Sequence, residues 1–164
     1  MKLEYICVGR IVNAHGIRGE VRVLPHRVPP EFLTACRRFY IDGAPVTPTA
    51  VHVHKGAVLV KLPGVDDRNA ALERKGTELL IRREDANLPA GQYFDDELIG
   101  LEVYDCDTLA LLGTLTEVET YPAGKVYTVK GAEREYLVPA VPEAFIRSVD
   151  IEQNRMEIKV WEGL

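Results

Sequence analysis

Apolar residues in the first half of the chain recur at the short intervals typical of β-strands. Residues 5–12 are rich in β-branched and apolar side chains, and residues 20–24 alternate charged with aliphatic positions. Further segments of this kind are residues 51–54, 57–62 and 78–81. Residues 66–76 predict one helix, which Asp66 can cap and which Gly76 can end in the left-handed conformation. Several short strands with a single helix predict a small antiparallel barrel.

The pattern breaks at residues 88–92, where a proline and a glycine oppose regular structure. Short strands then resume at residues 101–104, 111–118, 126–129, 136–138 and 156–161. Turns rich in Gly and Pro lie between them and again favour a small barrel. We therefore expect a mainly β protein with two barrel domains, residues 1–87 and 93–164, joined by a linker at 88–92.

The charge of the chain changes sign at the same place. The sequence holds 20 Lys and Arg against 25 Asp and Glu, a formal net charge of −5. Residues 1–40 have a net charge of +4, residues 41–90 of 0 and residues 91–164 of −9. A basic front and an acidic back suit a mixed target that contains RNA phosphate and basic protein, although charge can also segregate without a function.

Composition indicates a globular protein of the cytoplasm. Hydrophobic residues make up 46% and charged residues 27% of the chain, which is ordinary for a globular protein. No apolar run is long enough to span a bilayer, and the N-terminus has an early acidic residue and no small-residue cleavage site. The three cysteines, Cys7, Cys36 and Cys106, show no C-x-x-C spacing and predict reduced thiols. We expect a cytoplasmic monomer without membrane association.

No motif for catalysis or cofactor binding is present. The chain lacks a phosphate-binding P-loop, a G-x-S-x-G sequence and an H-E-x-x-H sequence. His52 and His54 share one face of a strand, but no third metal ligand is near and Lys55 disfavours a cation. Residues 95–97 are Asp-Asp-Glu and predict an exposed acidic turn, because adjacent residues on an extended chain diverge. We expect no catalytic residue, no cofactor and no metal.

Two glycines three residues apart mark the connection between the first two predicted strands. Gly16 and Gly19 permit positive φ and close backbone approach, and His15 and Arg18 lie beside them. Exposed amides in such a loop can bind a phosphate. The alternative is that the glycines only shape a tight connection between the strands.

With these residues in place, the chain resembles the RimM family of ribosome maturation factors. The matching landmarks run in order along nearly the whole chain, which makes chance similarity improbable. They are Val8–Ile11, His15–Val23, Asp67–Ala71, Gly76, Leu88–Pro89, Tyr93–Phe94, Leu98–Val103, Leu112–Gly113, Leu137–Val141, Val149–Asp150 and Glu162–Leu164. The chain departs from the family pattern at Phe94, usually Tyr, at residues 95–97, at Lys125, usually acidic, and at Tyr127, usually aliphatic.

The resemblance implies an N-terminal six-stranded barrel like the second domain of translation elongation factors, and a C-terminal PRC-barrel. Family members bind the small-subunit ribosomal protein numbered nineteen and support maturation of the subunit head and of 16S rRNA, without being nucleases. An aromatic pair that matters for ribosome association in the family maps onto Tyr93 and Phe94. We expect one of these rings to be buried and the other to be offered to the partner.

The leading hypothesis is a non-enzymatic assembly factor of the small ribosomal subunit. Its expected contacts with the ribosomal protein are Tyr93, Phe94, Asp95, Asp96 and Glu97. The residues expected to face 16S rRNA are Arg10, His15, Gly16, Arg18, Gly19 and Arg22. The rival hypothesis is an RNA-processing enzyme that acts directly on precursor rRNA. A third hypothesis, a cofactor-docking subunit, rests on analogy with other PRC-barrels.

Overall fold

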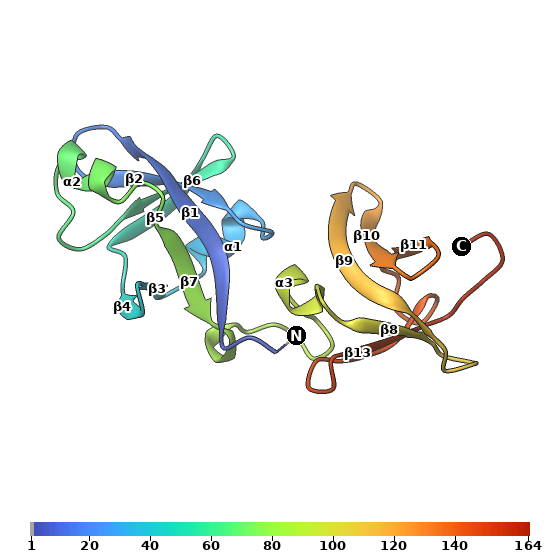
Figure 1. The fold of residues 1–164 in the computed structure, drawn as a ribbon. Coiled ribbons are helices and arrows are strands. Elements are labelled where there is room, and N and C mark those ends of the chain that lie inside the picture. Colours follow the sequence, from blue (N-terminus) through green and yellow to red (C-terminus); the bar gives the residue numbers. More distant parts are fainter. Residues whose placement is uncertain (1) are drawn as a thin grey trace. The chain divides into compact units, whose positions relative to one another are not determined.

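The computed structural model describes residues 2–164, which divide into two compact units (Figure 1). One unit comprises Glu4–Asn87, and the other comprises Leu88–Leu164 together with Lys2 and Leu3. Strands dominate both units, which confirms the predicted mainly β fold class. No helix within residues 2–164 has the length and apolar character needed to cross a bilayer.

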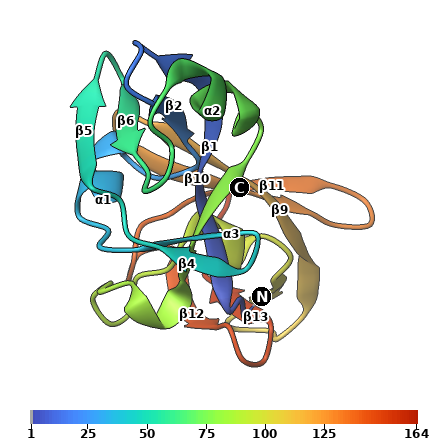
Figure 2. The same ribbon diagram turned by 90° about the vertical axis from the view of Figure 1, so that its left-hand side faces the viewer.

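The N-terminal unit holds one antiparallel sheet of seven strands that is curled upon itself (Figure 2). Its strands are β1 (Tyr5–His15), β2 (Glu20–Pro25), β3 (Phe39–Ile41), β4 (Ala44–Val46), β5 (Ala50–His54), β6 (Ala57–Lys61) and β7 (Glu78–Arg82). Their order across the sheet is β4-β3-β7-β1-β2-β6-β5. The resemblance implies six strands; the sheet has one more because the three-residue β4 pairs with β3 at its edge.

Alternation along the central strands sends one row of side chains into the core of this unit. Val21 and Val23 on β2 are fully buried, whereas Arg22 between them is exposed. The long strand β1 pairs with β2 on one side and β7 on the other, and it shifts register once against each partner. Burial of one aliphatic side chain contributes about 1.5–3 kcal/mol. The buried row therefore stabilises the strands that carry the β1–β2 loop.

Two α-helices and one 3-10 helix complete the N-terminal unit. α1 (Pro30–Thr34) was not expected, because consecutive prolines are typical of a loop. Pro30 nevertheless fits the first helical turn, because backbone N–H groups there have no intrahelical acceptor and its missing N–H costs no hydrogen bond. Leu33 of this helix is fully buried. α2 (Arg68–Glu73) is the helix that the sequence predicts, and η1 (Arg83–Asp85) follows β7.

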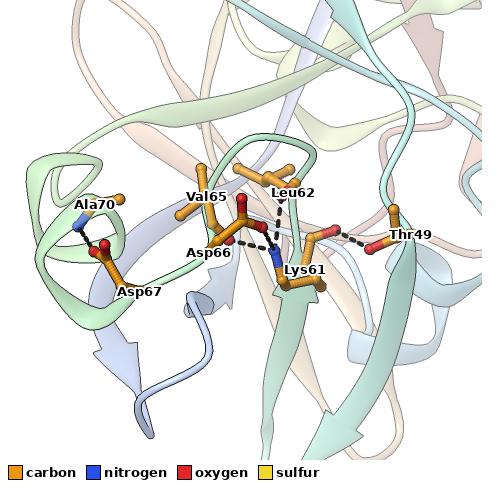
Figure 3. A network of polar contacts seen from close by, with 7 residues as sticks. All are labelled: Thr49, Lys61, Leu62, Val65, Asp66, Asp67 and Ala70. Atoms are coloured by element: carbon orange, nitrogen blue, oxygen red, sulfur yellow. Dashed lines mark hydrogen bonds and ion pairs between the residues drawn. The ribbon is translucent and has the colours of Figure 1, made fainter.

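The N-cap of α2 is Asp67, so the prediction of Asp66 is wrong. The Asp67 carboxylate accepts a hydrogen bond from the Ala70 amide at 2.7 Å. Asp66 instead pairs with Lys61 on β6, with 2.9 Å between Oδ1 and Nζ (Figure 3). Both residues are aspartates with the same capping ability, so the residue type alone does not separate them. Gly76 has a φ of +90° after the helix, as predicted.

The C-terminal unit holds a second curled sheet and one short helix. Its elements are α3 (Asp95–Leu98), β8 (Glu102–Asp105), β9 (Leu111–Tyr121), β10 (Gly124–Lys130), β11 (Glu135–Pro139), β12 (Ile146–Asp150) and β13 (Arg155–Ile158). The strand order is β11-β10-β9-β8-β13-β12, and β13 and β8 are parallel. The core of this unit consists of Leu98, Leu101, Val103, Leu115, Val129, Val138, Met156 and Ile158.

Besides α1 and η1, three further parts of this architecture were not predicted from the sequence. The hairpin of β3 and β4, the strand β12 and the helix α3 are each short and carry no clear periodic pattern. The last predicted strand, residues 156–161, ends earlier, at Ile158. Trp161 beyond it packs against Phe145, with 4.1 Å between ring centroids. The cysteines are free and partly buried, and burial raises the pKa of the Cys36 thiol to about 11.

Candidate functional site

The helix α3 turns the chain from the linker into the core of the C-terminal unit. The Glu97 carboxylate accepts a hydrogen bond from the Phe94 amide at 3.0 Å, and the Glu97 amide donates to the Phe94 carbonyl at 3.0 Å. Leu98 enters the core at the end of the helix. This reciprocal pair of hydrogen bonds closes the first turn of the helix. It also fixes the direction from which the chain, with its two aromatic residues, enters the helix.

Asp95 forms an ion pair that the sequence did not predict. Its Oδ1 lies 2.6 Å from Nζ of Lys125 on β10. The Asp95 side chain is 5% exposed and the Lys125 side chain 40% exposed, so the carboxylate is held inside and the ammonium closes it off from solvent. Lys125 is one of the departures from the family pattern, and here it supplies the positive charge that a buried carboxylate requires.

The expectation of an exposed acidic turn at residues 95–97 is therefore wrong. Asp95 and Glu97 are buried at 5% and 3% exposure, and Asp96 is intermediate. The segment is a helical turn rather than an extended chain, so two of its carboxylates point inward. The Lys125 ammonium pairs with Asp95, and the Phe94 amide donates a hydrogen bond to Glu97. The negative charge of this unit therefore lies mainly on other residues.

A groove of about 420 Å³ lies beside α3 within the C-terminal unit. Such a volume is within the range of ligand-binding clefts. One wall is formed by the linker with Tyr93 and Leu98, and the other by β10, the segment 140–142 and β12. Its apolar walls come from Leu98, Ile146 and Val149, and its polar groups from Lys125, Tyr127, Arg147 and Ser148.

The two aromatic residues after the linker occupy different environments. Tyr93 is half-buried, packs against the C-terminal core and lines the groove. Phe94 is 7% exposed. One ring is thus buried and the other partly open, although the role of either ring in binding a partner stays a prediction.

The charged hydrogen-bonding groups of the groove, Lys125 and Arg147, are donors. Burial raises the pKa of the Tyr127 phenol, and the nearby Asp95 carboxylate raises it further, so the hydroxyl stays protonated and can donate. Arg147 and Lys125 add cationic donors. Apolar walls with donors between them suit an apolar or aromatic side chain whose flanking backbone carbonyls face Tyr127 and the two cations.

The loop between β1 and β2 is tied to the segment that leads into α2. Gly19 has a φ of +92°, and a Cβ there would overlap the Val65 carbonyl and come within 2.9 Å of the Asp66 Cα. The Val65 carbonyl also accepts a hydrogen bond from Nζ of Lys61 (Figure 3). At the start of α2, Nη1 of Arg68 donates to the Gly16 carbonyl at 3.0 Å. Close packing therefore accounts for Gly19 without a ligand.

Gly16 is different, because its φ is +67° and a Cβ there would meet nothing within 4 Å. His15, Gly16, Arg18 and Gly19 lie together in or beside the β1–β2 loop. Arg22 is exposed on the outer side of β2.

Arg10 stands apart from this group. It lies opposite Leu24 near the other end of the β1–β2 ladder, and its Nη2 is 3.0 Å from the Glu78 carboxylate. The structure therefore does not gather all six residues expected to face RNA into one place.

Nothing in the sequence indicates that two residues, Ile17 and His54, belong to the surroundings of the β1–β2 loop as they do. Ile17 is 79% exposed at the loop tip. His54, at the end of β5, has its ring 5.3 Å from that of His15. The two histidines are far apart in sequence and meet only because the sheet curls, so no local pattern announces the contact.

No metal site emerges around these histidines. His52 Nε2 lies 4.0 Å from the Glu20 carboxylate, and the one cluster of three possible ligands within residues 2–164 is elsewhere, at Asp105, Cys106 and Asp107. The hydrogen bond from Lys159 lowers the pKa of Asp107, so a cation of the protein already occupies the neighbourhood of that carboxylate.

Profiles of known protein families match both units. The profile of the RimM N-terminal domain matches residues 6–86, and the profile of the RimM PRC barrel domain matches residues 95–164. The chain belongs to the RimM family.

Two full-length relatives support the assignment to the RimM family. The chain is 38% identical to the ribosome maturation factor RimM of Caldanaerobacter subterraneus over 98% of this chain and 99% of that protein. It is 38% identical to RimM of Symbiobacterium thermophilum over 98% and 94%, respectively. The crystal structure of a 16S ribosomal RNA processing protein RimM from Pseudomonas aeruginosa is 30% identical, with a TM-score of 0.48 over 96% of this chain and 98% of that chain.

Proposed function

We propose that this chain is a non-enzymatic assembly factor that binds the maturing small ribosomal subunit in the cytoplasm as a monomer. Its membership of the RimM family, whose relatives are named ribosome maturation factors, supports a role in ribosome assembly. The proposed protein partner is the ribosomal protein numbered nineteen of the subunit head, and the proposed consequence is support of 16S rRNA processing.

The observation that carries the proposal is the groove beside Tyr93. A partly open tyrosine next to an apolar cleft is a typical anchor point at a protein interface, because a ring buries a large area at little cost in side-chain entropy. An apolar side chain of the partner would fill the cleft, and its flanking carbonyls would accept from Tyr127 and Arg147.

The residues around Tyr93 then divide into contact and support. Tyr93 is proposed to contact the partner, and Asp96, which is partly exposed, is proposed as a second contact. Phe94, Asp95 and Glu97 hold the helical turn in place through burial, the ion pair with Lys125 and the hydrogen bonds of the first turn. Support of this kind keeps an interface preorganised and lowers the entropy lost on binding.

Long-range charge complements this contact. Residues 91–164 hold fifteen acidic residues against six basic ones, and Asp95 and Glu97 are the two that are buried. The remaining acidic side chains attract a basic partner at a distance, which speeds encounter more than it strengthens the complex.

The N-terminal unit is proposed to face rRNA. Its net charge is opposite in sign to that of the C-terminal unit, since residues 1–40 alone have a net charge of +4. Phosphate contacts of exposed arginines would make binding decline with salt. The residues proposed for this face from sequence are Arg10, His15, Gly16, Arg18, Gly19 and Arg22.

We expect the purified protein to sediment with free small subunits and not with large subunits or whole ribosomes. A factor that acts during maturation must bind the partner's arrangement in the free subunit more tightly than that in the finished ribosome. Sedimentation with each particle at one ionic strength measures this preference. Equal sedimentation with all three particles, or with none, would contradict the proposed function.

We also expect precursor small-subunit RNA to remain uncut after incubation with the protein, with or without magnesium. The groove offers cationic and phenolic donors but no carboxylate pair free to bind metal, since Asp95 is engaged by Lys125. Gel analysis of end-labelled RNA provides the measurement. Cleavage that copurifies with the protein and disappears when its exposed carboxylates are replaced would favour the rival enzyme.

A further inference from the structure

One end of the N-terminal unit combines features that the proposed protein contact leaves unused. The β1–β2 loop and the turn between β5 and β6 both lie toward the top of the N-terminal unit in Figures 1 and 2, although the pairing of Glu20 with Lys61 and of Val23 with Val58 places them at opposite ends of the β2–β6 ladder. They meet through His15 and His54, whose ring centroids are 5.3 Å apart with planes inclined by 59°. We call this end, made of residues 15–19 and 54–56 with the start of α2, the barrel end.

Three cations belong to the three segments of the barrel end. Arg18 lies in the β1–β2 loop, Lys55 in the β5–β6 turn and Arg68 at the start of α2. All three are exposed, and none forms an ion pair with a carboxylate within residues 2–164. Arg68 donates to the neutral Gly16 carbonyl and so keeps its full charge.

The carboxylates near this end are already engaged. Asp66 pairs with Lys61, and Asp67 accepts from the Ala70 amide as the N-cap of α2. Glu20 lies 4.0 Å from the His52 ring. Asp67 keeps its negative charge, because its partner is a neutral amide, but the three cations outnumber the carboxylates without a cationic partner, Asp67 and Glu20, so the net charge near the barrel end is positive.

An exposed apolar side chain stands among these cations. Ile17 is 79% exposed at the tip of the loop, directly before Arg18. An isoleucine and two imidazole rings beside cationic groups match the two parts of an unpaired nucleotide, a flat base that packs on apolar or planar groups and a phosphate that pairs with cations. A duplex would hide its base faces, and an acidic peptide would leave Ile17 and the rings without a partner.

We propose that the barrel end binds an unpaired segment of RNA, with bases against Ile17, His15 and His54 and phosphates on Arg18 and Lys55. The inference rests on the proposed function, because it supplies the contact to rRNA within the assembling subunit. It also replaces the scattered set expected from sequence, since Arg10 is paired with Glu78 and lies away from this end.

The test uses the full-length protein and a fluorescent unstructured RNA of about 12 nucleotides, within the usual site sizes for single strands. Anisotropy titrations between about 50 and 200 mM salt give the affinity and its salt slope. The variant Arg18→Glu/Lys55→Glu is compared with Arg37→Glu/Lys75→Glu, which makes the same charge change at exposed residues of the same unit outside the barrel end. A poly-glutamate peptide of similar charge serves as a competitor.

The barrel-end variant should bind at least tenfold more weakly, and its salt slope should fall by about 1.4, as expected for two lost contacts to single-stranded phosphate. The control variant should stay close to wild type. Ile17→Ser and His54→Ala should each lose about fivefold in affinity at an unchanged slope, because they remove base packing rather than charge.

Equal losses in the two charge variants would overturn the proposal, since only the total charge would then matter. Displacement of the RNA by poly-glutamate at equal charge concentration would overturn it in favour of an acidic protein partner. Neither result touches the binding of wild-type protein to free small subunits, whose failure would contradict the proposed function itself.

Discussion

Replacement of Tyr93 by Ala should weaken binding to free small subunits by about 2 kcal/mol, or roughly 30-fold, with little change in melting temperature. The ring is half-buried and lines the groove, so its removal takes away an anchor while α3 keeps its own hydrogen bonds. Quantitative sedimentation gives the affinity, and thermal unfolding gives the stability.

Phe94→Ala should instead lower the stability of the C-terminal unit, with loss of binding only as a consequence. Its side chain is 7% exposed, and truncation of a buried aromatic residue typically costs about 3–5 kcal/mol of stability. Tyr121→Ala is the matched control for Tyr93, because Tyr121 is an exposed tyrosine of the same unit outside the groove. If Tyr93→Ala loses binding only in proportion to stability, or if Tyr121→Ala loses as much, the groove is not the contact surface.

The engaged carboxylates of α3 change how charge is expected to act in this contact. A row of three exposed acids after the aromatic pair would have formed an acidic rim for a basic partner. Burial of Asp95 and Glu97 moves that role to acidic residues elsewhere on the unit, and the groove itself presents Lys125 and Arg147. Attraction at a distance and recognition at close range are thus carried by different residues, a division common in protein interfaces.

The features that the sequence predicts well are those set by near neighbours. Alternation over residues 20–24 fixes which face of β2 is buried, and Gly76 has the expected positive φ shortly after α2, although the helix itself ends at Glu73 with Arg74 as its C-cap. The features it misses depend on distant partners. The N-cap of α2 is an exception, because Asp67 accepts from Ala70 and Asp66 pairs with Lys61, and both partners are near in the sequence.

The same distinction applies to the candidate sites. Three consecutive acidic residues predict an exposed turn. Asp95 is buried because it pairs with Lys125, which lies 30 residues later on β10. The contact of His15 with His54 requires the curl of the whole sheet. By contrast, Gly16 and Gly19 have the positive φ that their spacing indicates, but spacing cannot separate a glycine that meets a ligand from one that meets the protein's own backbone.

Gly19→Ala should destabilise the N-terminal unit by about 3 kcal/mol. An alanine at a φ of +92° costs about 1–2 kcal/mol. The added Cβ would also overlap the backbone carbonyl of Val65, which cannot move freely because Lys61 donates to it, and overpacking of this kind costs a further 1–3 kcal/mol, roughly. Thermal unfolding of this unit should shift down by about 10 °C or more.

Gly16→Ala separates backbone strain from steric overlap as causes of the stability lost in Gly19→Ala. It introduces the same methyl group at a φ of +67°, where nothing lies within 4 Å, so only the backbone strain of about 1 kcal/mol remains. The difference between the variants measures the close approach of the β1–β2 loop to the segment before α2. Equal losses at Gly16 and Gly19 would show that strain alone matters. A larger loss at Gly16 would mean that the loop packs against something other than Val65. Loss at Gly19 above that at Gly16 identifies the second glycine as the point where the loop is fastened, which holds Ile17 and Arg18 at the barrel end.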